Sequence, residues 1–257
     1  MRIRDDVELA NASDVGCVRQ NNEDYFLFSE PADDAEFARR GRLLLVCDGM
    51  GGCNGGEVAS QLAAEAVRAA FLADETGDPR QALIEGFRRA QQAVLAAADD
   101  DHSLTGMGTT CSAAILRDGH LYLGHIGDSR IYLLRAGQAR QLTEDHTLVA
   151  RMVRDGLLSA EEAERHEQRN ILTQALGLDA NNVAGDFPPE PEQLAAGDVV
   201  LLCSDGLHGL VSGREMALTA ADQPLNQACL ELVTLAKVRG GHDNITLQML
   251  RMVKESS

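Results

Sequence analysis

Short apolar runs recur along the chain and predict a protein built from many strands. Each run has the length and the apolar, β-branched or aromatic content typical of a strand. The runs are VELANAS (7–13), YFLF (25–28), RLLLVC (42–47), TTCSAAIL (109–116), HLYLGHIG (120–127), RIYLLRAG (130–137), DVVLLC (198–203) and NITLQMLRMV (244–253). The turn-forming triplets RDG and GDS separate three of them, so we expect residues 109–137 to form an antiparallel meander.

Helical spacing of apolar residues predicts three longer helices between these runs. The segments 56–72 and 224–238 each carry one apolar stripe at helical spacing, and Gly240 and Gly241 close the second. A third helix starts after Asp78, because an aspartate followed by proline is typical of an N-cap and a first helical position. Two of these helices separate the early strands from the meander. That order predicts largely antiparallel sheets, hence an α+β layered sandwich rather than a doubly wound parallel sheet.

A shorter helical segment interrupts the strands at about 146–176. Within it, Ser159 and Glu162 have the spacing of a capping box. No low-complexity segment or linker marks a boundary elsewhere. We therefore expect residues 1–257 to form a single domain with one small helical excursion.

Composition and charge narrow the possible partners. Of 257 residues, 44% are hydrophobic and 25% are charged, and the net charge is −17. Nucleic acid and anionic membranes require a positive surface, so neither is expected as a partner. No apolar stretch approaches the roughly 20 residues that cross a bilayer. The first residues, MRIRDDVELA, lack a signal core, and the six cysteines form no C-x-x-C pair, so we expect a reduced, cytoplasmic protein.

The segment LLLVCDGMGGCNGGEVAS (43–60) combines a buried strand, a carboxylate and a glycine-rich loop. Such a loop suggests a phosphate cradle, but it lacks the lysine of a P-loop, and Asn54 stands where G-x-G-x-x-G needs a glycine. Asp48 also places negative charge where a phosphate would lie. A cation must therefore stand between them.

Asp48 is one of several carboxylates that lie at one end of a predicted strand. The full set is Glu23, Asp24, Asp48, Asp128, Asp205 and Asp243. Taken one at a time, each has an ordinary explanation as a turn residue or an exposed strand start, and a hairpin turn alone would explain Asp128. Taken together, acids that meet at one sheet edge would repel one another unless divalent cations separate them.

The donor set favours Mn²⁺ or Mg²⁺ over zinc. Carboxylate and carbonyl oxygens suit these ions, and the seven histidines show no H-E-x-x-H spacing. His242 could ligate, but packing or an indirect role is favoured. Arg19, four residues before Glu23, could bind a phosphate oxyanion or simply pair with nearby acids on the surface.

At this point the chain resembles a known family. RQNNEDYF, LLLVCDGMGG, TGMGTTCSAAIL, GHIGDSRIYLL, LTEDHTLV, LLCSDGL and GGHDNIT occur in the order found in the metal-dependent protein phosphatases (the PPM family, type 2C serine/threonine phosphatases). The motifs span about residues 9–250. The stretch 142–177 resembles the flap of bacterial members, and there is a further similarity to phosphatases that accompany type VI secretion systems.

The resemblance implies a four-layer α-β-β-α sandwich with the metals at one edge of two central antiparallel sheets. It implies that Asp24, Asp48, Asp205 and Asp243 bind two Mn²⁺ or Mg²⁺ ions, with the Gly49 carbonyl as a further ligand and Glu23 acting through water. Asp128 together with Asp205 would form a third site. Arg19 would bind the substrate phosphate. The resemblance therefore implies Arg19, Asp48 and Asp205 as the catalytic residues. Asn244 would lie just outside the ligand shell.

The hypothesis is a phosphoserine and phosphothreonine hydrolase that uses a metal-activated water and reverses a partner kinase in bacterial signalling, acting as a monomer. Many eukaryotic members carry histidine where this chain has Met50, and methionine cannot donate a proton. Leaving-group protonation therefore stays open. Two alternatives also stay open: an inactive phosphatase-like module that binds phosphoproteins or senses metal, and a metal phosphohydrolase acting on small molecules.

Overall fold

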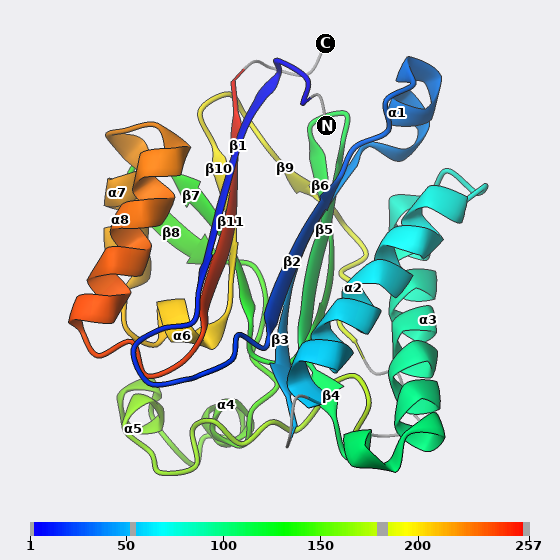
Figure 1. The fold of residues 1–257 in the computed structure, drawn as a ribbon. Helices are drawn as coiled ribbons and strands as arrows, with labels where there is room; N and C mark the ends of the chain where they lie inside the picture. The colour runs from blue at the N-terminus through cyan, green and yellow to red at the C-terminus, as the bar shows by residue number, and fades with distance from the viewer. Residues whose placement is uncertain (1–2, 52–54, 179–184, 254–257) are drawn as a thin grey trace.

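The computed structural model describes residues 3–51, 55–178 and 185–253, and in them two antiparallel sheets face each other (Figure 1). Sheet A has the order β1-β11-β10-β7-β8, with bounds Val7–Asp14, Ile245–Met252, Val199–Cys203, Arg130–Arg135 and Gln138–Gln141. Sheet B has the order β2-β3-β5-β6-β9, with bounds Asp24–Ser29, Arg42–Met50, Cys111–Arg117, His120–Ile126 and Glu192–Gln193, and β4 (Gly108–Thr109) pairs with β3. The expected antiparallel α+β sandwich is confirmed.

Helices cover the outer face of each sheet. Sheet A carries α7 (Gly213–Ala221) and α8 (Leu225–Val238), and sheet B carries α2 (Gly55–Ala73) and α3 (Pro79–Asp100) (Figure 1). The predicted cap of α3 is present: Asp78 directly precedes Pro79, and its side chain accepts a hydrogen bond from the Arg80 N–H. The chain is therefore a four-layer α-β-β-α sandwich.

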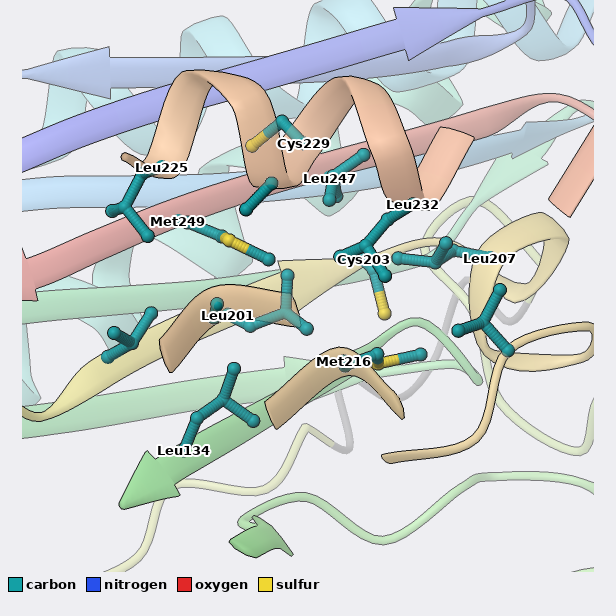
Figure 2. Packing of buried hydrophobic residues seen from close by; sticks show 14 of the residues in the cluster. Leu134, Leu201, Cys203, Leu207, Met216, Leu225, Cys229, Leu232, Leu247 and Met249 are labelled. Atoms are coloured by element: carbon teal, nitrogen blue, oxygen red, sulfur yellow. The ribbon is translucent and has the colours of Figure 1, made fainter. Parts of the chain in front are cut away.

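Alternation along the strands supplies three apolar layers. One face of sheet B packs on α2 and α3, one face of sheet A packs on α7 and α8, and the inner faces pack on each other. Figure 2 shows the layer under α7 and α8, where Leu201, Cys203 and Met249 from the sheet meet Met216 and Leu232 from the helices. These residues are buried, so the layers hold the sheet edge in place.

The predicted three-stranded meander is wrong in its third strand. Strands β5 and β6 pair with each other as expected, but β7 belongs to sheet A, where it pairs with β10 and β8. The GDS turn therefore carries the chain from one sheet to the other. Inner and outer faces of β7 are both buried, so its apolar pattern fits either sheet.

Strand β3 also extends further than the apolar run indicated. It continues to Met50, because Gly49 and Met50 pair with the short strand β4. Asp48 and Gly49 consequently lie inside the strand rather than in a loop after it. The next residues of the glycine-rich segment, 52–54 including Cys53, lie outside the described residues.

The segment 146–176 contains two short helices, α4 (Leu148–Arg154) and α5 (Ala160–Glu164), and the predicted capping box opens α5. In Figure 1 this segment, the flap, lies beneath the ends of both sheets. The remaining helices are α1 (Asp34–Arg40), α6 (Asp205–His208) and the 3₁₀ turn η1 (His102–Leu104). Across the described parts of the chain, no helix is both long and apolar enough to cross a bilayer.

Candidate metal centre

Two of the predicted acids face each other on neighbouring strands. Asp24 is the first residue of β2, and it lies directly opposite Asp48 near the end of β3. The Thr110 hydroxyl accepts the Asp48 N–H at 2.9 Å, which fixes the main chain there. Asp24 is buried, with 9% of its surface exposed. Sheet B therefore brings two carboxylates to one edge.

Sheet A supplies two more acids at the same edge. Asp205 follows β10 and begins α6, while Asp243 lies two residues before β11. Asn244 ties this corner to sheet B: its side-chain oxygen accepts the Glu23 N–H at 2.8 Å, and its amide donates to the carbonyls of Val15 and Asn21. Asn244 is buried, so it holds the loops that carry Glu23 and Asp243 together.

Asp128 reaches this edge because the chain changes sheet at its position. The hairpin explanation no longer applies, since β6 and β7 do not pair. The His208 imidazole of α6 donates to the Asp128 carbonyl at 2.9 Å. Asp145, whose charge acts on Asp128, accepts two hydrogen bonds from the Arg130 guanidinium, at 2.8 and 2.6 Å. Our sequence reasoning assigned no role to Asp145 or His208, although Asp145 belongs to the quoted motif LTEDHTLV.

The pKa values show that these acids share one electrostatic environment. Burial raises the pKa of Asp24 to about 7, although the Ser204 and Thr246 side chains lower it, and the nearby carboxylate of Asp205 raises it further. Burial raises the pKa of Asp48 well above its usual range, and the charges of Asp24 and Asp205 add to the effect. Burial also raises the pKa of Asp205 to about 6, with Asp243 adding to the effect.

Asp128 follows the same rule at the rim of the cluster. Burial raises its pKa to about 7, and the charge of Asp205 raises it further. The carboxylates thus disfavour one another's charge across two sheets, as acids crowded at one site must. Perturbed pKa values of this kind are typical of functional sites, and a divalent cation would relieve the repulsion.

Arg19 lies close to this cluster. Its guanidinium donates to Asp243 Oδ2 at 2.7 Å and lies 3.9 Å from Glu23 Oε2. The side chain is about half exposed, at 47%. The structure therefore brings Arg19 to the acids, as expected, with its guanidinium open to solvent.

The chemistry of these residues fits a hard divalent cation. All the donors are oxygens, and one of them, Asp24 Oδ1, is buried without a hydrogen-bond partner. Across residues 3–51, 55–178 and 185–253, no three His, Cys, Asp or Glu side chains already converge into a closed metal-binding group. Arg19 holds Asp243 instead. The donor set is suitable for such an ion in its chemistry.

Gly49 has a packing reason as well as a possible ligand role. A Cβ at Gly49 would lie 2.0 Å from the Gly56 carbonyl oxygen, and one at Gly56 would lie 2.8 Å from Glu23 Cδ. The two glycines therefore let the start of α2 approach β3 and Glu23. A side chain at either position would push the helix away from the acids.

A groove of about 1040 Å³ opens between the acids and the flap. Asp128, Asp205 and Asp243 lie along one side of it, and flap residues of α4 and α5 lie along the other. His242 is exposed and lines the groove, so of the packing or indirect role favoured from the sequence, its position agrees with the indirect one. A ligand in the groove would contact the acids and the flap together.

Comparison with known proteins agrees with this geometry. The family model described as protein phosphatase 2C matches residues 19–234. The chain is similar to the protein phosphatase PhpP of Streptococcus pneumoniae, with 35% identity over 256 residues that cover 98% of this chain and 100% of that protein.

Two solved structures are similar throughout. The catalytic domain of the serine threonine protein phosphatase PstP, in complex with two manganese ions, is 34% identical, with a TM-score of 0.82 and coverage of 96% of this chain and 99% of that one. PppA, described as a key regulatory component of the type VI secretion system in Pseudomonas aeruginosa, is 28% identical, with a TM-score of 0.80 and coverage of 95% and 97%.

Proposed function

Because the chain belongs to the protein phosphatase 2C family, we propose that it is a metal-dependent phosphatase of phosphoserine and phosphothreonine in proteins. One observation carries the proposal: two sheets bring Asp24, Asp48 and Asp205 to one edge with raised pKa values, and Asp205 lines a groove there. Such a cluster costs stability unless cations bind it. It is therefore explained by binding rather than by folding.

The proposal assigns the ligands from their positions. Asp24, Asp48, Asp205 and Asp243 would hold two Mn²⁺ or Mg²⁺ ions, helped by the Gly49 carbonyl and by Glu23 through water, and Asp128 with Asp205 would hold a third. When bound, the ions supply a water of lowered pKa for attack on phosphorus. Asn244 keeps the loops that carry these acids in place.

The chain's own residues then orient the substrate. Arg19 would exchange its hydrogen bond to Asp243 for the oxygens of a phosphoryl group, since a guanidinium binds both through the same N–H donors. Met50 lies next to Gly49 and can donate no proton. The leaving oxygen would take its proton from water in the open groove.

Phosphorylated proteins are the proposed substrates, and a serine/threonine kinase acts in the opposite direction. With a net charge of −17, long-range attraction of a phosphopeptide is weak, so the bound cations must supply recognition. We propose that residues 1–257 act as one cytoplasmic, monomeric phosphatase domain whose flap borders the substrate. The similarity to PppA supports a place in type VI secretion control.

Hydrolysis by the purified full chain tests this function. We expect p-nitrophenyl phosphate and a phosphothreonine peptide to be hydrolysed with Mn²⁺, and EDTA to abolish the activity. Asp205→Asn should fold and lose activity. Mn²⁺ binding without turnover of either substrate would favour the inactive module instead. Preference for sugar phosphates over the phosphopeptide would favour a small-molecule phosphohydrolase.

A further inference from the structure

A row of hydroxyl groups crosses sheet A and ends on Asp24. On neighbouring strands β1 and β11, Ser13 lies opposite Thr246, and their hydroxyl oxygens are 2.7 Å apart. The Thr246 N–H donates to Ser204 Oγ at 3.0 Å, and Ser204 follows β10. Ser204 Oγ then donates to Asp24 Oδ2 at 2.7 Å. Ser204 thus carries the contact from sheet A to a carboxylate of sheet B, and Thr246 on β11 fixes the Ser204 hydroxyl.

The single hydroxyl proton of Ser204 can point in only one favourable direction. The Ser204 oxygen already accepts a hydrogen bond from the Thr246 N–H, so its own proton must point elsewhere. The Thr246 carbonyl is 3.5 Å away, whereas Asp24 Oδ2 is 2.7 Å away and belongs to a carboxyl group. A main-chain hydrogen bond from the Ser204 N–H to the Thr246 carbonyl, at 3.0 Å, also fixes the residue itself. Ser204 is completely buried, so it has no room to turn away.

The two oxygens of Asp24 are therefore in different situations. Oδ2 accepts the Ser204 proton, and the Thr246 side chain also lowers the pKa of Asp24, while Oδ1 is buried and makes no hydrogen bond of normal geometry. A buried oxygen without a partner is unfavourable, and native proteins rarely keep one without a reason. Ser204 occupies one oxygen and leaves the other available to a ligand.

This hydrogen bond also joins the two sheets at the acid edge. Asp24 lies on β2 of sheet B, opposite Asp48, and Ser204 directly precedes Asp205 on the sheet A side. The Ser204 hydroxyl thus connects Asp24 of sheet B to the chain segment that carries Asp205 beside sheet A. A shift of about 1 Å between such groups is enough to weaken a metal site.

We propose that Ser204 is a positioning residue, which selects Asp24 Oδ1 as the oxygen offered to a divalent cation and sets the spacing between the acids of the two sheets. The proposal rests on the proposed function only in that Asp24 binds metal. The effect of Ser204 on catalysis passes through Asp24.

Mn²⁺ titration of the full chain by calorimetry tests the proposal without any substrate. Ser204→Ala should weaken Mn²⁺ binding by about 10- to 100-fold, the usual effect of losing a partner of a metal ligand. Ser204→Thr, which keeps the hydroxyl, should restore much of the affinity. At saturating Mn²⁺ the KM for p-nitrophenyl phosphate should stay unchanged, since the phosphate contacts are intact.

Ser112→Ala is the matched control. Ser112 is also completely buried, and its hydroxyl contacts His125 Nδ1 and the Ser129 carbonyl rather than an acid. Both alanine variants should lose thermal stability, but only Ser204→Ala should lose Mn²⁺ affinity. Wild-type Mn²⁺ affinity in Ser204→Ala, or an equal loss in Ser112→Ala, would overturn the proposal.

Ser204→Cys keeps the measurement possible if the alanine variant does not fold, because a thiol fills the space but is a weak donor. The same direction of change is expected, and unchanged affinity would overturn the proposal. Failure of the proposed function looks different. The wild-type chain would then bind Mn²⁺ without hydrolysing phosphoesters, and the comparison between Ser204 variants could still be read.

Discussion

Strands β2 and β3 present a buried carboxylate at each of their two ends, and the chain treats the two differently. At one end, which we call the acid end, Asp24 lies opposite a second acid, Asp48. At the other, the arginine end, Glu30 follows β2, and its oxygens lie 2.6 Å from the Arg4 guanidinium and 3.3 Å from Arg42 Nε. Both Asp24 and Glu30 are buried. Each has one carboxylate oxygen without a hydrogen-bond partner, but two arginines lie beside Glu30, whereas other acids lie beside Asp24.

The arginine end is further stabilised by its surroundings. Arg42 donates twice to Asp6 at 2.9 Å, and the guanidinium carbons of Arg4 and Arg42 lie 3.9 and 4.9 Å from the centre of the Phe37 ring. Charge and cation–π contacts together retain a buried ion pair there. The difference teaches that this fold can neutralise a buried carboxylate when the carboxylate is structural. At the acid end the proposed function assigns the neutralising charge to divalent cations.

The largest expected effect comes from breaking the acid end. Asp48→Asn should lower kcat on the order of 10³-fold, as expected when a charged group that organises the reaction is removed. In EDTA the same variant should melt at a higher temperature than the wild type, because repulsion from Asp24 and Asp205 is relieved. Kinetics with p-nitrophenyl phosphate and calorimetry measure the two effects. Near-normal turnover would refute the ligand assignment, and a lower melting temperature would refute the repulsion.

The second effect comes from breaking the arginine end. Arg42→Met leaves Glu30 with Arg4 as its remaining partner and should lower the free energy of unfolding by about 3 kcal/mol. The kcat of the folded fraction should not change, because the acid end is intact. Urea denaturation followed by assays at low urea measures both quantities.

Arg42→Met combined with Glu30→Gln provides the control for this variant. Removing the carboxylate should recover most of the lost stability, since no uncompensated buried carboxylate remains and Asp6, which also loses Arg42, is partly exposed. A loss of Mn²⁺ affinity in the single variant would contradict the independence of the two ends.

A third, smaller effect concerns pH. Burial raises the pKa of Asp24 in the folded chain from 3.8 to about 7. Its contribution to the stability of the metal-free protein is therefore complete below pH 3.8 and lost as pH rises towards 7. Divalent cations should replace that contribution. The rise in melting temperature caused by Mn²⁺ should be greater at pH 8 than at pH 5.5, where protons compete for the same oxygens.

A buried histidine changes stability in the opposite direction and must be separated from this effect. Burial lowers the pKa of His125 from 6.5 to about 4, so its contribution is lost as pH falls through that range. It acts with or without metal. Only the difference between Mn²⁺ and EDTA at each pH reports on the acid end, and a difference independent of pH would contradict the prediction.

Local sequence signals were enough to predict most of the acid end. Asp48 and Asp205 each follow an apolar run and precede glycine, and that placement at a strand end is visible without a structure. The capping boxes were visible in the same way, although we read the one at Ser159 and missed the one formed by Ser212 and Glu215, which opens α7. What a few neighbouring residues determine could be predicted.

Contacts between distant residues could not be predicted. The GDS turn suits a hairpin locally, and only the pairing of β7 with β10 determines that the chain changes sheet there. The Ser204–Asp24 hydrogen bond joins residues 180 positions apart. The arginine end depends likewise on Glu30 and Arg42 meeting across β2 and β3, although no motif marks either residue. The positions of the individual acids were therefore predictable, and so were Asn244 and Arg19 beside them, but Ser204 and the arginines around Glu30 were not.

The smallest expected effect sharpens the comparison, because an arginine also lies at the acid end. Among the described residues, Arg19 is the ion-pair partner of Asp243, yet its side chain is 47% exposed, whereas that of Arg42 is 1% exposed. An exposed pair contributes little to stability, about 0–1 kcal/mol. Arg19→Ala should therefore barely change the melting temperature.

It should instead raise the KM for p-nitrophenyl phosphate, and the inhibition constant for inorganic phosphate, by about tenfold, the loss expected for one hydrogen bond to a charged group. Arg19→Lys should give an intermediate KM, because an ammonium keeps the charge but not the two parallel donors. Steady-state kinetics and melting curves on the same preparations decide the matter. If Arg19→Ala destabilised the fold as much as Arg42→Met while KM stayed constant, Arg19 would be a structural arginine, and the two ends of the sandwich would not differ in the way we describe.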